Sequence, residues 1–221
     1  MTSQPGTDSE KALRDIWAVA HLDSKALEWI NLEGVEPVLP STYKTGVCAQ
    51  SSIAAAGLAA AEIWRHRTGE TQAVSVNMKE AAIAFRSERY AELEGSPVRK
   101  APDSIHGFYR CEDEGWIQIH SNYPNHRDGV VKALGCEASR EEVAKKLANL
   151  KASTAEDLLT GFALPAGMMR SPEEWSRHPQ SLALSKLPLI DIERIGDGPP
   201  IEFKSDPQRP MEGVRVLEMT K

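Results

Sequence analysis

The residues best suited to chemistry lie in one short stretch, IHSNYPNHRD, at positions 119–128. The imidazole, amide and guanidinium groups of His120, Asn122, His126 and Arg127 could together bind a carboxylate or a phosphate. The stretch joins an expected strand end to an expected helix start, where free backbone amides favour anions. We take these four residues as a candidate substrate-binding set. The alternative is that they only cap the helix and solvate the loop.

A metal site in the same region is suggested by residue type alone. His106, Cys111, His120 and His126 are all ligand types, but their spacing matches no zinc pattern, so we expect no metal site. The sequence also contains no GxSxG, no HExxH and no glycine-rich phosphate loop. The catalytic residues are therefore unknown from these patterns.

The three cysteines provide no recognisable nucleophile. Cys48, Cys111 and Cys136 are scattered and form neither a CxxC pair nor a disulfide framework. A nucleophilic Cys48 or Cys136 would need a neighbouring base and a lowered pKa, and the sequence indicates neither. We expect both to be small buried residues, and the pattern favours a reduced, cytoplasmic compartment.

Two charged clusters also have plain structural explanations. The carboxylates at 112–114 could do acid–base work, but at an exposed hairpin tip their acidity would be ordinary, so we expect a solvated turn. Arg65, His66 and Arg67 could contact a nucleotide phosphate. They also fall in the last turn of a predicted helix, where cations complement the helix dipole.

The composition narrows the class of protein. The chain has 221 residues, enough for one large or two small domains, and 41% of them are apolar. Its net charge of −6 argues against a nucleic-acid-binding surface. No apolar run approaches the roughly 18 residues of a membrane span, and the N-terminus lacks the regions of a secretory signal. We expect neither nucleic acid nor membrane as a partner.

Residues 1–100 are predicted to be mainly helical, with one strand. A capping box at Thr7 and Glu10 begins a first helix, and Asp23 caps a second that carries Ala26, Leu27 and Ile30. An apolar run predicts a helix over 50–67 that stops at Gly69. A strand over 72–76 and a helix over about 78–92 follow, with Met78, Ala82 and Phe85 facing inward.

Residues 101–170 are predicted to form a small α+β domain. The stretch 106–120 indicates a β-hairpin with an acidic turn that ends at Gly115. A helix runs from Pro124 to Gly135. Two further helices are predicted to be capped by the pairs Ser139 with Glu142 and Ser153 with Glu156.

Residues 171–212 are predicted to be a return segment and a proline-rich linker. Ser171, Pro172 and Glu174 begin a helix, residues 187–195 are extended, and 196–210 have linker composition. The last run, GVRVLEM at 213–219, alternates apolar and polar residues and predicts a strand.

The order of these segments resembles CoA-transferase family III, the CaiB/BaiF type. WRHRTGETQAVSV (64–76) resembles the family's R-x-x-T-G-x-G-Q segment after an alanine-rich helix, and GFYRCEDEGWIQIH (107–120) its Y-R-x-x-D-G-x-W hairpin. VVKALGC (130–136), MRSPEEWSRHPQ (169–180) and PMEGVRVLEMTK (210–221) are similar to a helix ending in Leu-Gly, a segment with a His-Pro step and the opening strand GVRVLDLT. Together these segments cover most of residues 50–221.

The resemblance implies a Rossmann-like large domain, a smaller domain and interlocked dimers. It implies transfer of coenzyme A from an acyl-CoA thioester to a carboxylic acid, so the chain would be a transferase of sulfur-containing groups. An Asp carboxylate would attack the thioester, and backbone amides would stabilise the oxyanions. No bound cofactor is implied, because the CoA thioester is a substrate. A homodimer or a missing second half would be the protein partner.

The chain departs from the family pattern in three places. The opening-strand segment comes at the end, so we expect the first half of a longer two-part member, truncated where the second half starts, with 213–221 as the first strand of an absent Rossmann-like domain. Nothing matches the family's Asp motif, and Asp23 is expected to be a helix cap. Thr71 stands where the family has its second Gly.

These observations together predict an incomplete, helix-rich α/β fold with a β-hairpin small domain. They predict a CoA-transferase-like chain that is inactive alone, because the region of the nucleophilic Asp is absent. The alternative is a non-catalytic binding or scaffolding protein that retains part of the fold.

Overall fold

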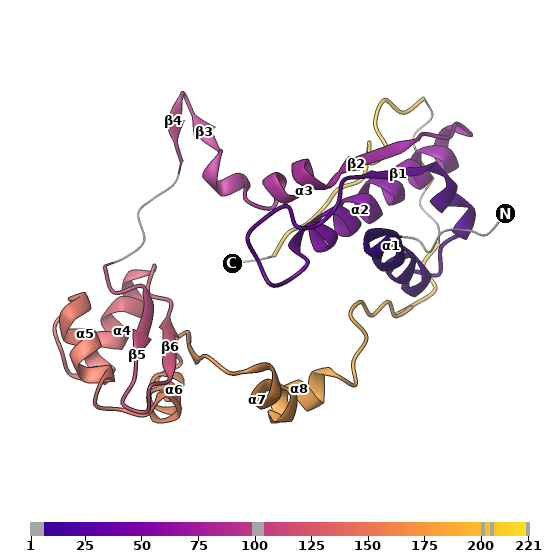
Figure 1. The fold of residues 1–221 in the computed structure, drawn as a ribbon. Helices are drawn as coiled ribbons and strands as arrows, with labels where there is room; N and C mark the ends of the chain where they lie inside the picture. Colours follow the sequence, from indigo (N-terminus) through magenta and orange to yellow (C-terminus); the bar gives the residue numbers. More distant parts are fainter. Residues whose placement is uncertain (1–6, 99–103, 200–201, 204–205, 220–221) are drawn as a thin grey trace. The chain divides into compact units, whose positions relative to one another are not determined.

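The computed structural model describes residues 7–98, 104–199, 202–203 and 206–219. The chain divides into two compact units (Figure 1). The first unit joins Met1–Val98 with Pro188–Lys221, and the second spans Arg99–Leu187. The fold is mixed α/β and rich in helix, as the sequence predicted.

Helix α1 (Asp8–Val19) begins at the predicted capping box. The Glu10 amide donates to the Thr7 hydroxyl at 3.3 Å, and the Thr7 amide donates to the Glu10 carboxylate at 2.9 Å. The helix buries Leu13 and Trp17, and the Trp17 indole donates to the Asp23 carbonyl at 3.0 Å. The cap and the apolar face together fix this helix against the rest of the first unit.

Asp23 caps the next segment as predicted, since its carboxylate accepts from the Lys25 amide at 3.0 Å. That segment is a short 3-10 helix, η1 (Ser24–Trp29), and the prediction of a helix through Ile30 was wrong. At Ile30 the chain enters strand β1 (Ile30–Glu33), which pairs in parallel with β2 (Val74–Asn77). The sequence predicted β2 but missed β1, because four residues are too few to show alternation and the partner lies far along the chain.

Helix α2 (Thr45–Thr68) is the longest element, and it starts five residues before the predicted helix. It ends at Gly69, as predicted, which has φ 81° and donates its amide to the Arg65 carbonyl at 2.8 Å. By length and composition alone α2 could cross a membrane. It packs against α1, α3, β1 and β2, which is the environment of a core helix.

Helix α3 (Met78–Ala84) is shorter than the predicted helix over 78–92. Met78 and Ala82 are buried as predicted, but Phe85 is exposed, so its inward placement was wrong. The chain after Phe85 is polar and has no apolar face to bury, so the helix gives way to η2 (Ser87–Arg89). A short antiparallel hairpin follows, formed by β3 (Glu92–Leu93) and β4 (Ser96–Pro97), which have two residues each.

The second unit is built on a three-stranded antiparallel sheet in the order β5-β6-β7. Strands β5 (Gly107–Arg110) and β6 (Trp116–Ile119) form the predicted hairpin. Strand β7 (Ala166–Met168), which the sequence did not predict, pairs with the other side of β6. The central strand β6 buries Ile117 and Ile119 completely, which places one face of the sheet in the core.

Three helices complete this core: α4 (Pro124–Leu134), α5 (Arg140–Leu147) and α6 (Ala152–Gly161). Helix α4 begins with Pro124 and ends at Gly135, and Ser139 caps α5, all as predicted. The side chains in this core come from the sheet, from α4, α5 and α6 and from the segments between them. Those that are fully buried include Ile105, Ile117, Ile119, Val130, Val143, Leu147 and Leu159.

The start of α6 differs from the prediction. The N-cap is Lys151, so Ser153 is not a cap. Asp113 from the hairpin turn supplies the missing acceptor, since the Ala152 amide donates to its two carboxylate oxygens at 3.2 and 3.3 Å. The turn is exposed at residues 112–114, as predicted, and Asp113 has the further role of capping α6, because tertiary contact brings the turn to a helix end.

Two short helices, α7 (Pro172–Arg177) and α8 (Pro179–Leu184), end the second unit. The predicted capping box of Ser171 and Glu174 begins α7.

Of the last segment, residues 214–219 form no ladder with a strand that the structure describes. The strand predicted over 213–219 stays a prediction.

Candidate functional site

The candidate loop between β6 and α4 is fixed at both ends by backbone hydrogen bonds. The His120 amide donates to the Pro165 carbonyl at 3.0 Å, and Ser121 is fully buried. The His126 and Arg127 amides both donate to the Tyr123 carbonyl at 3.0 Å. The loop therefore has one defined path from the sheet into the helix.

The side chains of His120, His126 and Arg127 make separate contacts. The His120 ring meets His106 edge to face, with centroids 4.9 Å apart, and His126 meets Tyr123 in the same way at 5.5 Å. The Arg127 Nε donates to the Asp128 carboxylate at 2.9 Å. Asn122 is exposed. The loop presents four polar groups within eight residues, and their binding of an anion stays a prediction.

The start of α4 has features that suit an anion. Its N-cap, Tyr123, makes no side-chain capping bond, and the positive end of the helix dipole is therefore not neutralised by its own cap. The His126 Nδ1 is buried and has no hydrogen-bond partner within the described part of the chain. Beside His120, a hollow of about 310 Å³ is lined by Gln118, His120, Pro165, Ala166 and Gly167.

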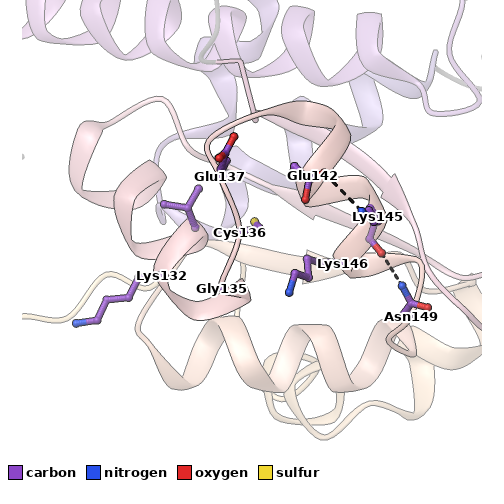
Figure 2. Close-up of a pocket in the computed structure, with 9 residues that line it drawn as sticks. Lys132, Gly135, Cys136, Glu137, Glu142, Lys145, Lys146 and Asn149 are labelled. Carbon is purple, nitrogen blue, oxygen red and sulfur yellow. Dashed lines mark hydrogen bonds and ion pairs between the residues drawn. The ribbon is translucent and has the colours of Figure 1, made fainter.

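A hollow of about 1000 Å³ in the second unit lies between α4 and α5. Figure 2 shows around it Lys132 of α4, Glu142, Lys145 and Lys146 of α5, and Glu137 from the loop between the two helices. The Lys145 ammonium pairs with Glu142 at 3.8 Å. Since the lysines lie in the last turns of their helices, complementing the helix dipoles already explains them. The residues around the hollow are Val131, Lys132, Gly135, Cys136, Glu137, Glu142, Lys145, Lys146 and Asn149.

The cysteines do not form activated nucleophiles. Burial raises the pKa of the Cys136 thiol, and the Lys146 ammonium only partly opposes that rise. Burial also raises the pKa of Cys111, with the charge of Asp113 adding to it. Cys48 is exposed, so its predicted burial was wrong; it lies on the solvent side of the first turn of α2. Cys111 and Cys136 thus lack the depressed pKa that nucleophilic catalysis requires.

The arginines at the end of α2 are occupied by protein groups. Arg65 donates to both carboxylate oxygens of Glu62, at 3.0 and 3.1 Å, and lies 5.9 Å from the Trp29 ring centre. The hydrogen bond from Arg65 to Glu62 raises the pKa of the guanidinium further. Arg67 donates to backbone carbonyls of the C-terminal segment. A nucleotide phosphate would have to displace these partners.

Two residues with a clear role were missed by the sequence analysis. The fully buried amide of Gln50 donates to the carbonyls of Glu33 at 2.9 Å and Val76 at 2.8 Å, at the carboxyl ends of β1 and β2. The Glu36 carboxylate accepts from the Val47 and Val38 amides, and these bonds, Val47 foremost, lower the pKa of Glu36. In the sequence, the position of Gln50 as a lone glutamine in an alanine-rich helix could have indicated a buried polar role. Nothing in the sequence around Glu36 indicated its role.

No group of three or more metal-ligating side chains is found within the residues that the structure describes. His106 and His120 touch, but Cys111 faces the core, where burial raises the pKa of its thiol. A thiol in that state is a poor metal ligand.

Comparisons with known proteins assign most of the chain to one protein family. The family model of CoA-transferase family III matches residues 19–196. An acyl-CoA transferase from Gibberella moniliformis is 26% identical over 127 residues, which are 51% of this chain and 22% of that protein. The chain thus spans only about a fifth of the curated relative it matches.

Solved structures share the fold at lower identity. The hypothetical protein Rv3272 from Mycobacterium tuberculosis is 17% identical with a TM-score of 0.54, over 82% of this chain and 52% of that one. A point mutant of the same protein gives 0.55 at 17% identity, over 94% and 58%. At this identity the likeness concerns the fold alone, and it extends over about half of the mycobacterial chain.

The family match covers both units, from the end of α1 to the segment after α8. The segments that resembled the family in the sequence lie mostly inside it, including the α2 end, the β5–β6 hairpin and α4. This chain belongs to CoA-transferase family III.

Proposed function

We propose that the chain is part of an enzyme that moves coenzyme A from an acyl-CoA thioester to a carboxylic acid. The observation that carries the proposal is the family match over residues 19–196. The name of the fungal relative, acyl-CoA transferase, supports the same reaction class. The substrates would be an acyl-CoA and a free acid, and coenzyme A would pass through as a reactant and not as a resident cofactor.

Within this proposal, the 221 residues alone do not supply the nucleophile. The reaction requires a carboxylate that attacks the thioester carbonyl and releases the CoA thiolate, leaving an acyl anhydride on the protein. The carboxylates with resolved pKa shifts, Glu36 and Glu156, are held by their own amide and arginine partners. Asp23 and Asp113 act as helix caps.

A trapping experiment tests this point. The purified chain is incubated with an acyl-CoA and then with hydroxylamine, which converts acyl anhydrides and thioesters of a side-chain carboxylate into hydroxamates. We expect no hydroxamate on any Asp or Glu by peptide mass spectrometry. The fungal acyl-CoA transferase treated in parallel is the positive control. A hydroxamate on this chain would show that it holds the nucleophile and would overturn the proposed inactivity.

We further propose that His120, Asn122, His126 and Arg127 contact an anionic group of the substrate, a CoA phosphate or the acid's carboxylate. The uncapped start of α4 and the unpaired Nδ1 of His126, within the described residues, support this placement.

A titration with coenzyme A should shift the backbone NMR signals of His126 and Arg127. Replacing Arg127 by Ala should weaken binding by about tenfold, the effect of one charge-assisted hydrogen bond.

The matched control is Arg110→Ala, which removes an exposed arginine of the same unit that pairs with Glu114. An equal loss in both variants would indicate general charge attraction and would contradict the site. Binding of neither coenzyme A nor an acyl-CoA would favour the second candidate function, a non-catalytic scaffolding protein that retains the fold.

A further inference from the structure

Arg67, in the last turn of α2, reaches a segment more than a hundred residues further along the chain. Its Nη1 donates to the carbonyls of Pro210 at 2.7 Å and Glu212 at 3.0 Å, with that of Arg209 at 3.5 Å. Its guanidinium carbon lies 4.7 Å from the centre of the Phe203 ring. All of these partners belong to the first unit, so the contact lies inside one compact body.

The segment that Arg67 contacts, residues 206–214, is a compact turn with its own hydrogen bonds. The Glu212 amide donates to the Arg209 carbonyl at 3.2 Å, and the Val214 amide donates to the Met211 carbonyl at 3.1 Å. The Gln208 amide donates to the Glu212 carboxylate at 2.7 Å. This folding turns several carbonyl oxygens toward one point, where a single guanidinium nitrogen, Nη1 of Arg67, donates to them.

The dipole of α2 does not explain this arrangement. Arg65, two residues earlier, complements the same helix end while it pairs with Glu62 on the helix itself. An arginine that served only the dipole would lie along the helix in solvent. Arg67 instead donates hydrogen bonds to carbonyls that come together when the C-terminal segment is folded.

We propose that Arg67 is a positioning residue that holds the turn at 206–214 against the C-terminal end of α2. This gives a structural role to an arginine of the WRHRTGE motif. It also fixes the point from which residues 214–219 leave the turn. That short run exposes Val216 and Leu217, each at 81%, so its direction decides where an apolar surface is presented.

Hydrogen–deuterium exchange on the full chain tests the proposal. In Arg67→Ala, the amides of Gln208, Glu212 and Val214 should exchange about 10- to 100-fold faster, because two to three charge-assisted bonds that stabilise the turn are lost. Amides in the middle of α2, around Leu58, should keep their protection. The matched control is Arg65→Ala, which removes the same charge from the same helix end and should leave the turn unchanged.

Arg67→Lys separates the two roles of the cation. Lysine keeps the charge at the helix end. It replaces the guanidinium, which lies over the Phe203 ring and points one nitrogen at the carbonyls of the turn, with an ammonium on a flexible stem. We expect its thermal midpoint to match the wild type while the turn still exchanges about tenfold faster. Full protection of the turn in Arg67→Lys, or equal acceleration in Arg65→Ala, would overturn the proposal. So would loss of protection in α2 to the same extent as in the turn.

Discussion

Gln50 lies fully buried in a helix made largely of alanine, and both of its amide hydrogens are used. It joins the ends of β1 and β2, two strands that residues 34–73 separate in the sequence. The sequence identified the helix but not this role, because a buried partner on a distant strand leaves no mark at position 50 itself. The same limit applies to Glu36, whose carboxylate accepts from the first turn of α2.

Replacing Gln50 by Leu tests this residue. The two side chains have similar volumes, so the main change is that the Glu33 and Val76 carbonyls lose a buried donor. We expect the free energy of unfolding to fall by about 2–4 kcal/mol, measured by urea titration. Ser52→Ala, on the exposed side of the same helix, should change it by less than about 0.5 kcal/mol. A Leu variant as stable as the wild type would refute the bridging role.

At the scale of elements, capping residues and apolar periodicity predicted the helices correctly where the residues that form the cap are close in the sequence. Thr7, Asp23, Ser139 and Ser171 cap their helices as expected, since each bond closes within a few residues. The failure at α6 has the opposite cause, because its cap, Asp113, comes from a separate hairpin. The strands β1 and β7 were missed for the same reason: each is short and depends on a partner strand distant in sequence.

The predicted Glu156 cap has another role, which links α6 to the end of β7. Its carboxylate accepts from the Arg170 guanidinium and from the Met168 amide, the latter at 3.0 Å, and both charged side chains are about four-fifths buried. The hydrogen bond from Arg170 lowers the pKa of Glu156 below its ordinary value of 4.5. The stabilisation is therefore fully present above pH 4.5 and is lost as the pH falls through the lowered folded-state value.

Replacing Glu156 by Gln should remove this pH dependence. At neutral pH we expect the variant to be less stable by about 2 kcal/mol, as for a hydrogen bond to a charged group. The difference from the wild type should begin to shrink below pH 4.5, where the carboxyl of the unfolded wild-type protein becomes protonated, and it should be lost as the pH falls through the lowered folded-state pKa. Urea midpoints from pH 7 down to about pH 3 measure this. Glu141→Gln, an exposed position on α5, is the control; a difference that does not depend on pH would contradict the assignment.

For the whole molecule, the two units differ in how they are stabilised. The second unit has one continuous core drawn from its sheet and three helices. The first unit has two smaller clusters around α1 and α2, and it keeps several large apolar side chains exposed, among them Tyr43, Leu93, Val216 and Leu217. The first unit also joins two distant stretches of sequence, and Arg67 is one of the groups that connects them.

The sequence by itself determined the helix-rich α/β class, the main helices, the hairpin and the family, because these depend on local periodicity, local caps and the order of short motifs. Only the tertiary structure decided that Asp113 caps α6, that Gln50 joins two strands and that Arg67 binds the C-terminal turn. It also separated the four candidate loop residues into contacts with different neighbours. In each of these cases the hydrogen-bond partners are far apart along the chain, and folding alone brings them within reach.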